Sequence, residues 1–271
     1  MKRVITLIAV LAIAISVPAR SGILVAQFGT SNDEGRKASL DVLYTDLQSA
    51  FPEYDIREAY TSPTIRRILA KRGVNKDSVT DALLRMHLDG IDTVMVQPTF
   101  LLDGVEMQML RDEVAAVTSL FSNVRIGVPL LYTIDDFKAL AAILSAESPA
   151  RREAIMYVGH GNEYASTSAY AMLGSMLQHA GSSHSYIGTI EGWPDLQASV
   201  AQLTGKGYRK VTLVPLLLAA GVHAREDIDG EWRPAVESIG CKAEVRLQGL
   251  GERQAIRQMV IDHLRQLQKS I

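Results

Sequence analysis

The chain alternates short, continuous apolar runs with longer segments whose apolar residues recur every three or four positions. A continuous apolar run is typical of a strand buried on both faces, and the longer recurrence is typical of a helix with one buried face. The segment 33–50 shows the helical pattern clearly, with Leu40, Leu43 and Leu47 on one face. The whole pattern therefore predicts strands and helices in alternation.

Strands and helices predicted in this way follow each other along the entire chain after residue 22. The predicted strands are 22–29, 54–60, 92–98, 123–129, 153–161, 185–192, 209–218 and 242–250. The predicted helices are 33–50, 63–72, 77–88, 105–120, 134–144, 164–180, 194–204, 224–238 and 252–269. Alternation of this kind predicts parallel sheets covered by helices on both faces.

The second half of the chain repeats the plan of the first, with a junction near residues 146–152. Matching glycines and prolines align the two copies: Gly29 with Gly161, Pro63 with Pro194, Pro98 with Pro215, and Gly104 with Gly221. The alignment puts Tyr60 opposite Glu191 and Glu106 opposite His223. An internal repeat of this length predicts two similar units.

The predicted fold class is therefore α/β, with two similar (βα)4 halves. Each half is a parallel four-stranded sheet flanked by helices, spanning residues 22–148 and 149–271. Ligands of parallel sheets bind at the carboxyl ends of the strands, so we expect the active-site cleft between the two halves.

The amino terminus has the pattern of a secretory signal peptide. Lys2 and Arg3 precede an apolar stretch over 4–16, and Ala19 closes a small-residue cleavage motif. We predict that residues 1–19 are a signal peptide and that the protein is periplasmic. An uncleaved anchor is the alternative, and no other segment of the sequence is apolar enough to span a membrane.

Composition narrows the range of functions. Hydrophobic residues make up 47% and charged residues 21%, with a formal net charge of −2, which is ordinary for a globular protein and lacks the basic character of a nucleic-acid binder. The single cysteine, Cys241, excludes an intrachain disulfide and a CxxC site. We expect Cys241 to be a small buried residue near a strand.

Three polar side chains fall at strand ends in the second half: His160, Glu191 and His223. Each alone is more often structural, but all three share the sheet edge at which such folds bind ligands. Two imidazoles and a carboxylate suit a divalent transition metal, and they also relay protons near neutral pH. The other histidines are interpreted as structural: His87, His179, His184 and His263. No phosphate-binding P-loop or GxSxG hydrolase motif is present.

These residues lie in segments that resemble the class II tetrapyrrole chelatases, and most closely the anaerobic-type sirohydrochlorin cobaltochelatases of the CbiK family. The resemblance covers nearly the whole chain after the predicted signal peptide. It rests on "ILVAQFGTS", "YVGHGN", "GTIEGWP" and "VPLLLAAGVHAREDI". It implies that His160, Glu191 and His223 are both metal ligands and catalytic residues.

The resemblance also implies a cleft in which a tetrapyrrole such as sirohydrochlorin binds, lined by Phe28, Glu106 and Gly221. The small residues 219–221 are expected to let a flat ring approach. One segment departs from the family: "QPTFLLDGVEM" has Phe100 where a histidine is common and Met107 where a tyrosine is common. This departure weakens the case for a first-half ligand at position 100, whereas Glu106 is retained.

The function expected from the resemblance is insertion of Co²⁺, with Fe²⁺, Ni²⁺ and Zn²⁺ as alternative substrate metals, into sirohydrochlorin. The predicted export favours a second hypothesis, an exported tetrapyrrole or metal carrier that retains the chelatase fold, with haem as a candidate ligand. A metal chaperone that binds no ring is a third hypothesis. The family resemblance further implies assembly into a homo-oligomer.

Overall fold

The computed structural model of the protein describes residues 20–270, apart from the side chains of residues 222–224. The predicted signal peptide, residues 1–19, lies outside the described residues. The first strand begins at Arg20, two residues earlier than predicted, and the Arg20 side chain donates to the carbonyl of Asp89 at 2.9 Å. None of the helices within residues 20–270 is long and apolar enough to cross a membrane.

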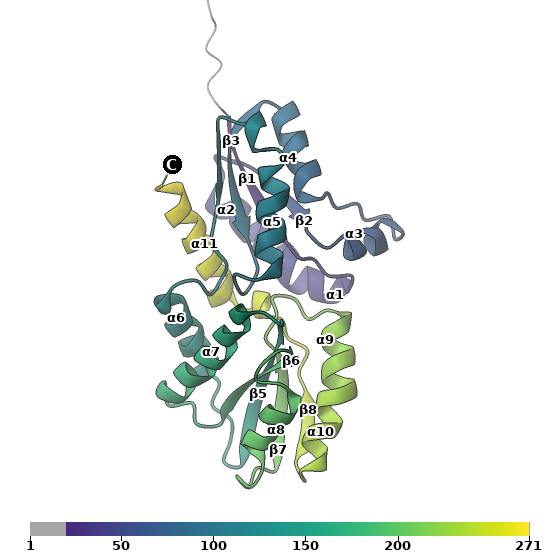
Figure 1. Cartoon of the computed structure of the whole chain (residues 1–271), viewed down its shortest axis with the longest axis vertical. Coiled ribbons are helices and arrows are strands. Elements are labelled where there is room, and N and C mark those ends of the chain that lie inside the picture. Colours follow the sequence, from purple (N-terminus) through teal and green to yellow (C-terminus); the bar gives the residue numbers. More distant parts are fainter. Residues whose placement is uncertain (1–19, 271) are drawn as a thin grey trace, which may run out of the picture.

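Two parallel four-stranded sheets form the centre of the protein (Figure 1). The strands are β1 (Arg20–Gln27), β2 (Asp55–Tyr60), β3 (Ile91–Pro98), β4 (Asn123–Ile126), β5 (Glu153–Gly161), β6 (Ser185–Glu191), β7 (Lys210–Pro215) and β8 (Lys242–Val245). Their orders are β2-β1-β3-β4 and β6-β5-β7-β8. Because the second order reproduces the first, the predicted fold of two similar (βα)4 halves is confirmed.

Helices follow the strands as predicted. They are α1 (Asp33–Gly35), α2 (Asp41–Ala50), α3 (Pro63–Ala70), α4 (Val79–Leu88), α5 (Val105–Ala115), α6 (Ile134–Ser145), α7 (Ser168–His179), α8 (Leu196–Leu203), α9 (Val222–Asp227), α10 (Arg233–Ser238) and α11 (Gln254–Gln268). Short π- or 3-10 segments are η1 (Arg36–Leu40), η2 (Thr118–Leu120), η3 (Ala165–Thr167), η4 (Ile228–Trp232) and η5 (Leu250–Glu252).

Several predicted helices differ in detail from those observed, and two of them show why. The segment predicted as one helix over 33–50 contains the π-helical turn η1. The helix predicted to start at Pro194 instead starts at Leu196, because the Asp195 carboxylate accepts the backbone N–H of Ala198 at 2.8 Å and caps the helix there.

Separate hydrophobic clusters cover one face of each sheet. Helices α4 and α5 pack on the first sheet through Leu83, Met86 and Leu110. The α8 and η4–α10 segments pack on the second sheet, where Trp232 is 1% exposed. Cys241 belongs to this second cluster and is buried, as predicted.

The remaining faces of the two sheets share a single core. Helix α6 precedes β5 in the chain, yet it lies beside α7 on the second sheet, and the Tyr157 hydroxyl donates to the Leu144 carbonyl at 3.2 Å (Figure 1). Helix α11 follows β8, yet it runs back along the first half beside α2 and β3. The two helices therefore join both halves into one hydrophobic cluster.

Polar contacts fix α11 in this position. The Arg257 Nε donates to the Asp46 carboxylate of α2 at 2.6 Å. The His263 Nε2 lies 2.8 Å from Asp136 Oδ1 at the start of α6, and both side chains are largely buried. Burial alone would raise the pKa of Asp136, but hydrogen bonds from His263 and Thr133 outweigh it and lower that pKa.

The Asp136 contact predicts a pH-dependent contribution to stability. Since the folded-state pKa lies below the unfolded-state value, the contribution is present above about pH 4 and is lost as the pH falls through the folded-state pKa. We expect Asp136→Asn to lower the free energy of unfolding at pH 7 by about 1.5–3 kcal/mol, the range for a hydrogen bond to a charged group. Urea unfolding should show this loss shrinking at pH 3.

The control is Asp135→Asn, which changes a neighbouring carboxylate whose side chain is 87% exposed and pairs only with Lys138 among the described residues. Its effect should stay within about 0.5 kcal/mol. Equal losses in the two variants, or a loss for Asp136→Asn that does not shrink in acid, would contradict the assignment.

Candidate functional site

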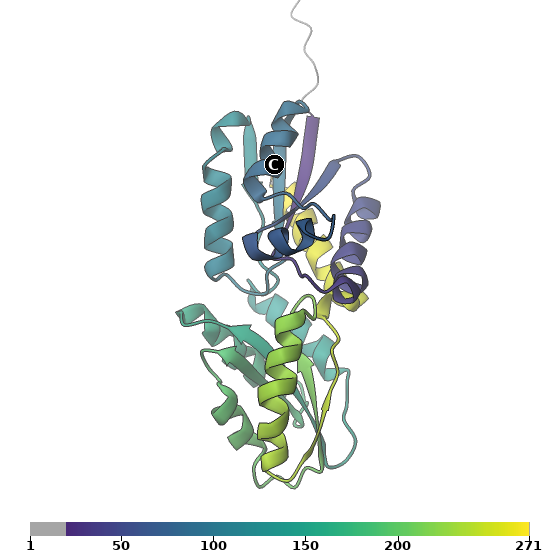
Figure 2. The same ribbon diagram turned by 90° about the vertical axis from the view of Figure 1, so that its right-hand side faces the viewer.

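The carboxyl ends of the two sheets face each other where the halves meet. Two contacts mark this junction. A Cβ atom placed on Gly221 would lie 3.2 Å from Thr30 Oγ1, which follows β1, and one on Gly104 would lie 3.3 Å from Asn162 Nδ2, which follows β5. In Figure 2 the α9–α10 segment runs down the second half, and its upper end lies just below α1. Residues at the strand ends of both halves therefore meet in one region.

His160 and Glu191 lie side by side in this region. His160 is the penultimate residue of β5 and Glu191 is the last residue of β6, the neighbouring strand. His160 Nδ1 is 4.0 Å from Glu191 Oε2, and the two side chains are 53% and 55% exposed. The structure thus brings together two of the three predicted ligands, with access to solvent.

The tautomer of His160 is set by its own strand. Its Nδ1 lies 3.0 Å from the Gly161 carbonyl oxygen. A carbonyl can only accept a hydrogen bond, so this contact favours a proton on Nδ1 and leaves Nε2 with its lone pair free for a metal or a proton. Glu191 lies on the Nδ1 side, so both groups reach one ion only after a side-chain rotation, and their exposure leaves room for it.

The glycines around this pair are required by geometry. Gly161 has φ +77°, and a Cβ atom there would lie 1.7 Å from the Glu191 carbonyl oxygen. Gly192 has φ +81°, and its Cβ would lie 2.3 Å from the Asn162 carbonyl oxygen. Glycine adopts a positive φ readily, so Gly161 lets β5 and β6 approach each other at their ends.

Tyr170 of α7 packs against the end of β5, a role that the sequence analysis did not predict. Its buried hydroxyl accepts the Gly161 backbone N–H at 3.4 Å. A Cβ atom on Gly159 would lie 2.1 Å from the Tyr170 ring, so this glycine makes room for the tyrosine. Burial raises the pKa of the Tyr170 hydroxyl to about 12. The hydrogen bond with the Gly161 backbone opposes this rise, and the Glu106 carboxylate adds a smaller increase. Tyr170 therefore stays protonated and acts as a fixed support.

Glu106 reaches toward this support from the first half. It is the second residue of α5 and is partly exposed. Its Oε2 would lie 3.7 Å from a Cβ atom on Gly104, beside Asn162. The contact between Gly104 and Asn162 places Glu106 near the strand end that carries His160. The two halves thus bring carboxylates to the same junction.

His223 is the second residue of α9, which begins beyond the carboxyl end of β7. Strands β6, β5 and β7 are neighbours in one sheet, so the backbone of His223 follows the same sheet edge as His160 and Glu191. Its side chain lies outside the described residues, and its role as a ligand stays a prediction. Among the side chains that the structure does describe, no group of three histidines, cysteines or acids is placed to hold a metal ion.

The small residues 219–221 have a packing role. Ala220 is 4% exposed, its carbonyl accepts from Asn32 Nδ2 at 3.4 Å, and a Cβ atom on Gly35 would lie 2.6 Å from that carbonyl. Close contact between the halves thus accounts for Ala220, whereas contact of Gly221 with a ring stays a prediction. Phe28, just after β1, is 48% exposed.

Further exposed aromatic residues follow the strands of the second half. Trp193 is 58% exposed and follows Glu191 by two residues, and Tyr164 is 65% exposed and follows β5. Exposed aromatic rings at a strand outlet are a signal that the sequence offered and that our predictions did not use. By contrast, Phe100 and Met107, which depart from the family pattern, are 7% and 1% exposed and belong to the core.

Comparison with known proteins gives matches over most of the chain. Residues 21–269 match the family described as cobalt chelatase (CbiK). The chain is 32% identical over 254 residues to a sirohydrochlorin cobaltochelatase of Salmonella typhimurium, covering 91% of this chain and 96% of that protein. It is also 32% identical to the sirohydrochlorin cobaltochelatase CbiKC of Nitratidesulfovibrio vulgaris, covering 90% of this chain and 89% of that protein.

Solved structures agree on the fold. SirB from Bacillus subtilis with Fe³⁺ superposes with a TM-score of 0.67 at 15% identity, covering 92% of this chain and 95% of that one. CbiX, described as the terminal enzyme of sirohaem biosynthesis in denitrifying bacteria, superposes with a TM-score of 0.55 at 16% identity, covering 90% and 98%. The matched family, the two relatives and the paired sheets with His160 and Glu191 at their junction lead to one conclusion: the chain belongs to the CbiK family of cobalt chelatases.

Proposed function

We propose that the protein inserts Co²⁺ into sirohydrochlorin at the junction between its two halves. The observation that carries the proposal is the exposed pair His160 and Glu191 at adjacent strand ends, in a chain whose relatives are named sirohydrochlorin cobaltochelatases. Fe²⁺, Ni²⁺ and Zn²⁺ are the alternative substrate metals, since the same donor types bind each of them.

The ring is proposed to bind against the exposed aromatic side chains at the strand outlets. Trp193 and Tyr164 supply flat apolar surface in the second half, and Phe28 supplies it in the first. Stacking against such rings suits a planar macrocycle. Glu106 and Gly221 border the same region and complete the proposed lining.

In the proposed mechanism the metal is a substrate, held by His160, Glu191 and His223 beside the ring. Insertion replaces two pyrrole N–H protons with one divalent ion, so two protons must be accepted for each metal transferred. The Glu106 carboxylate is a suitable acceptor from the start. The Nε2 of His160 and the carboxylate of Glu191 become available as acceptors as the ion passes from them to the ring nitrogens. Three ligands leave coordination positions open, which lets the ion pass to the ring nitrogens.

The mechanism predicts a strong effect of His160→Ala. Because this change removes both a ligand and a proton acceptor, we expect the rate of cobalt insertion to fall by about 100-fold or more. The rate is measured from the absorbance change of sirohydrochlorin upon metal insertion. His179→Ala, which removes an exposed histidine at the end of α7, is the control and should keep full activity. Undiminished insertion by His160→Ala would disprove the assignment.

The backbone contact at Gly161 predicts a separable effect. In Gly161→Ala the new methyl group meets the Glu191 carbonyl, so β6 must move and Glu191 shifts relative to His160. We expect about 2–3 kcal/mol of lost stability and a fall in insertion rate of about tenfold or more. Thermal unfolding and the insertion assay measure the two effects.

Gly181→Ala is a matched control for this variant. Gly181 has φ +84°, but a Cβ atom there meets nothing within 4 Å. It should lose only about 1 kcal/mol through backbone strain and keep its insertion rate. If the two variants behave alike, the contact between Gly161 and Glu191 does not position the site.

We also propose that the protein is exported, on the basis of the signal-peptide pattern over residues 1–19. Export favours the second candidate function, a carrier for tetrapyrrole or metal, because an exported protein would meet the ring outside the compartment in which the ring is synthesised. A bound pigment that survives dialysis, combined with no insertion of added cobalt, is the result expected of a carrier. Ready insertion by the purified protein is the result expected of a chelatase.

Export predicts a defined amino terminus. The protein expressed from its full sequence should appear in the periplasmic fraction and begin at Arg20, as determined by mass spectrometry. A chain that remains in the membrane fraction and retains Met1 would instead identify residues 1–19 as an anchor. A full-length chain in the soluble cytoplasmic fraction would contradict export.

A further inference from the structure

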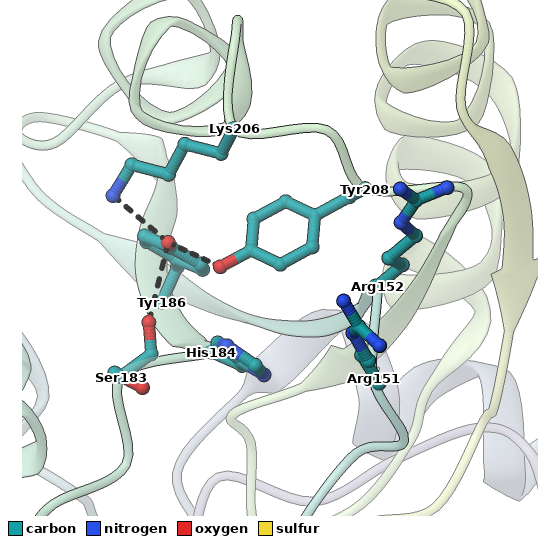
Figure 3. A pocket seen from close by; sticks show the side chains of 7 residues that line it. All are labelled: Arg151, Arg152, Ser183, His184, Tyr186, Lys206 and Tyr208. Carbon is teal, nitrogen blue, oxygen red and sulfur yellow. Dashed lines mark hydrogen bonds between the residues drawn. The ribbon is translucent and has the colours of Figure 1, made fainter.

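A second polar pocket lies at the amino-terminal edge of the second sheet, opposite the edge that carries His160 and Glu191. Its volume is about 440 Å³. Its lining comes from the turns that precede β5, β6 and β7 (Figure 3). Since β5 runs from Glu153 to Gly161, the pocket and the chelatase site lie about 25 Å apart. The pocket therefore belongs to a different part of the surface.

The pocket carries positive charge without a neutralising carboxylate. Arg151, Arg152 and Lys206 contribute the charge, and none of the residues lining the pocket is acidic. The side chains of the two arginines make no hydrogen bond or ion pair with any described residue. The nearest acids in the sequence have other partners: Glu147 pairs with Arg246 and Arg253, and Glu153 pairs with Lys210.

Hydrogen-bonded aromatic residues form the wall of the pocket. The hydroxyls of Tyr186 and Tyr208 lie 2.8 Å apart, and Lys206 Nζ donates to the Tyr186 hydroxyl at 3.0 Å (Figure 3). The His184 ring meets the Tyr208 ring edge-on, with 5.5 Å between their centroids. These contacts fix the rings, and they use one of the three N–H donors of Lys206. Two donors of Lys206 remain for a ligand.

The backbone at Arg152 is held in an unusual conformation. Its φ is +68°, which makes it the one non-glycine residue with a positive φ among residues 20–270. Its carbonyl oxygen accepts the backbone N–H of Arg209 at 2.8 Å, so the turn is tied to the start of β7. A non-glycine residue in this region is strained, and such strain persists only where the surroundings impose it. The two arginines are thereby placed in the pocket wall.

We propose that this pocket binds a small anion with several charged oxygens, either a polyphosphate or a polycarboxylate. The guanidinium groups suit planar, paired contact with phosphate or carboxylate oxygens, and Lys206 and the ring hydroxyls supply further donors. The three cations line one concavity of about 440 Å³, which favours a small molecule over an extended surface. The site is separate from the proposed metal insertion and does not depend on it.

The test is calorimetric titration of the full chain with inorganic pyrophosphate and, separately, with citrate, at low ionic strength. We expect saturable binding of at least one anion. The anion that binds more tightly shows whether the natural ligand is a polyphosphate or a polycarboxylate. Arg152→Gln and Lys206→Gln should each weaken binding by about tenfold, the effect of losing one charge-assisted contact. Arg152→Lys keeps the positive charge and should therefore weaken anion binding less than Arg152→Gln does.

Lys242→Gln is the matched control, since it removes an exposed positive charge from the amino end of β8 without touching the pocket. It should leave anion binding unchanged, and all four variants should keep native insertion activity and melting temperature. Absence of saturable binding would overturn the proposal. So would an equal loss in Lys242→Gln, or binding to vesicles of anionic lipid with none to either small anion.

Discussion

The exchange of two helices between the halves is the constraint on which the rest of the structure depends. Helix α6 leaves the first half to cover the second sheet, and α11 returns to cover the first. A single hydrophobic core therefore spans both sheets, and the His263–Asp136 pair joins the exchanged helices directly. Because the halves are fixed in this way, the strand ends of one sheet stay opposite those of the other. A site divided between two sheets requires such fixing.

At the junction of the halves, the candidate site side chains are exposed, whereas the backbone that positions them is closely packed. His160 and Glu191 are half exposed, so a metal and a large ring can reach them. Their strands, in contrast, meet through the Gly161–Glu191 contact and rest on the buried Tyr170. The backbone at these strand ends is therefore closely packed, whereas the two side chains are open to solvent.

The strands, the repeat and the positions of His160 and Glu191 at strand ends could be predicted from the sequence, because each leaves a local pattern. Buried parallel strands are continuous apolar runs, and His160 and Glu191 stand where those runs end. The sequence pattern shows that a helix has an apolar face, but it does not show which element packs against that face. Phe137 and Leu140 mark a buried face of α6, but periodicity does not say that it packs beside α7 on the second sheet. Tyr170 was missed for the same reason, since it reaches the site from a helix.

The exchange of helices also bears on how the protein is made. Synthesis proceeds from the amino terminus, and the fifteen residues of α11 are made after all eight strands of the two sheets. Until then, the surface formed by β3 and α2 lacks its cover, and the first half cannot complete its core. The two repeats therefore cannot mature one after the other as independent units. Completion of the first half's core therefore has to wait until α11 has been synthesised.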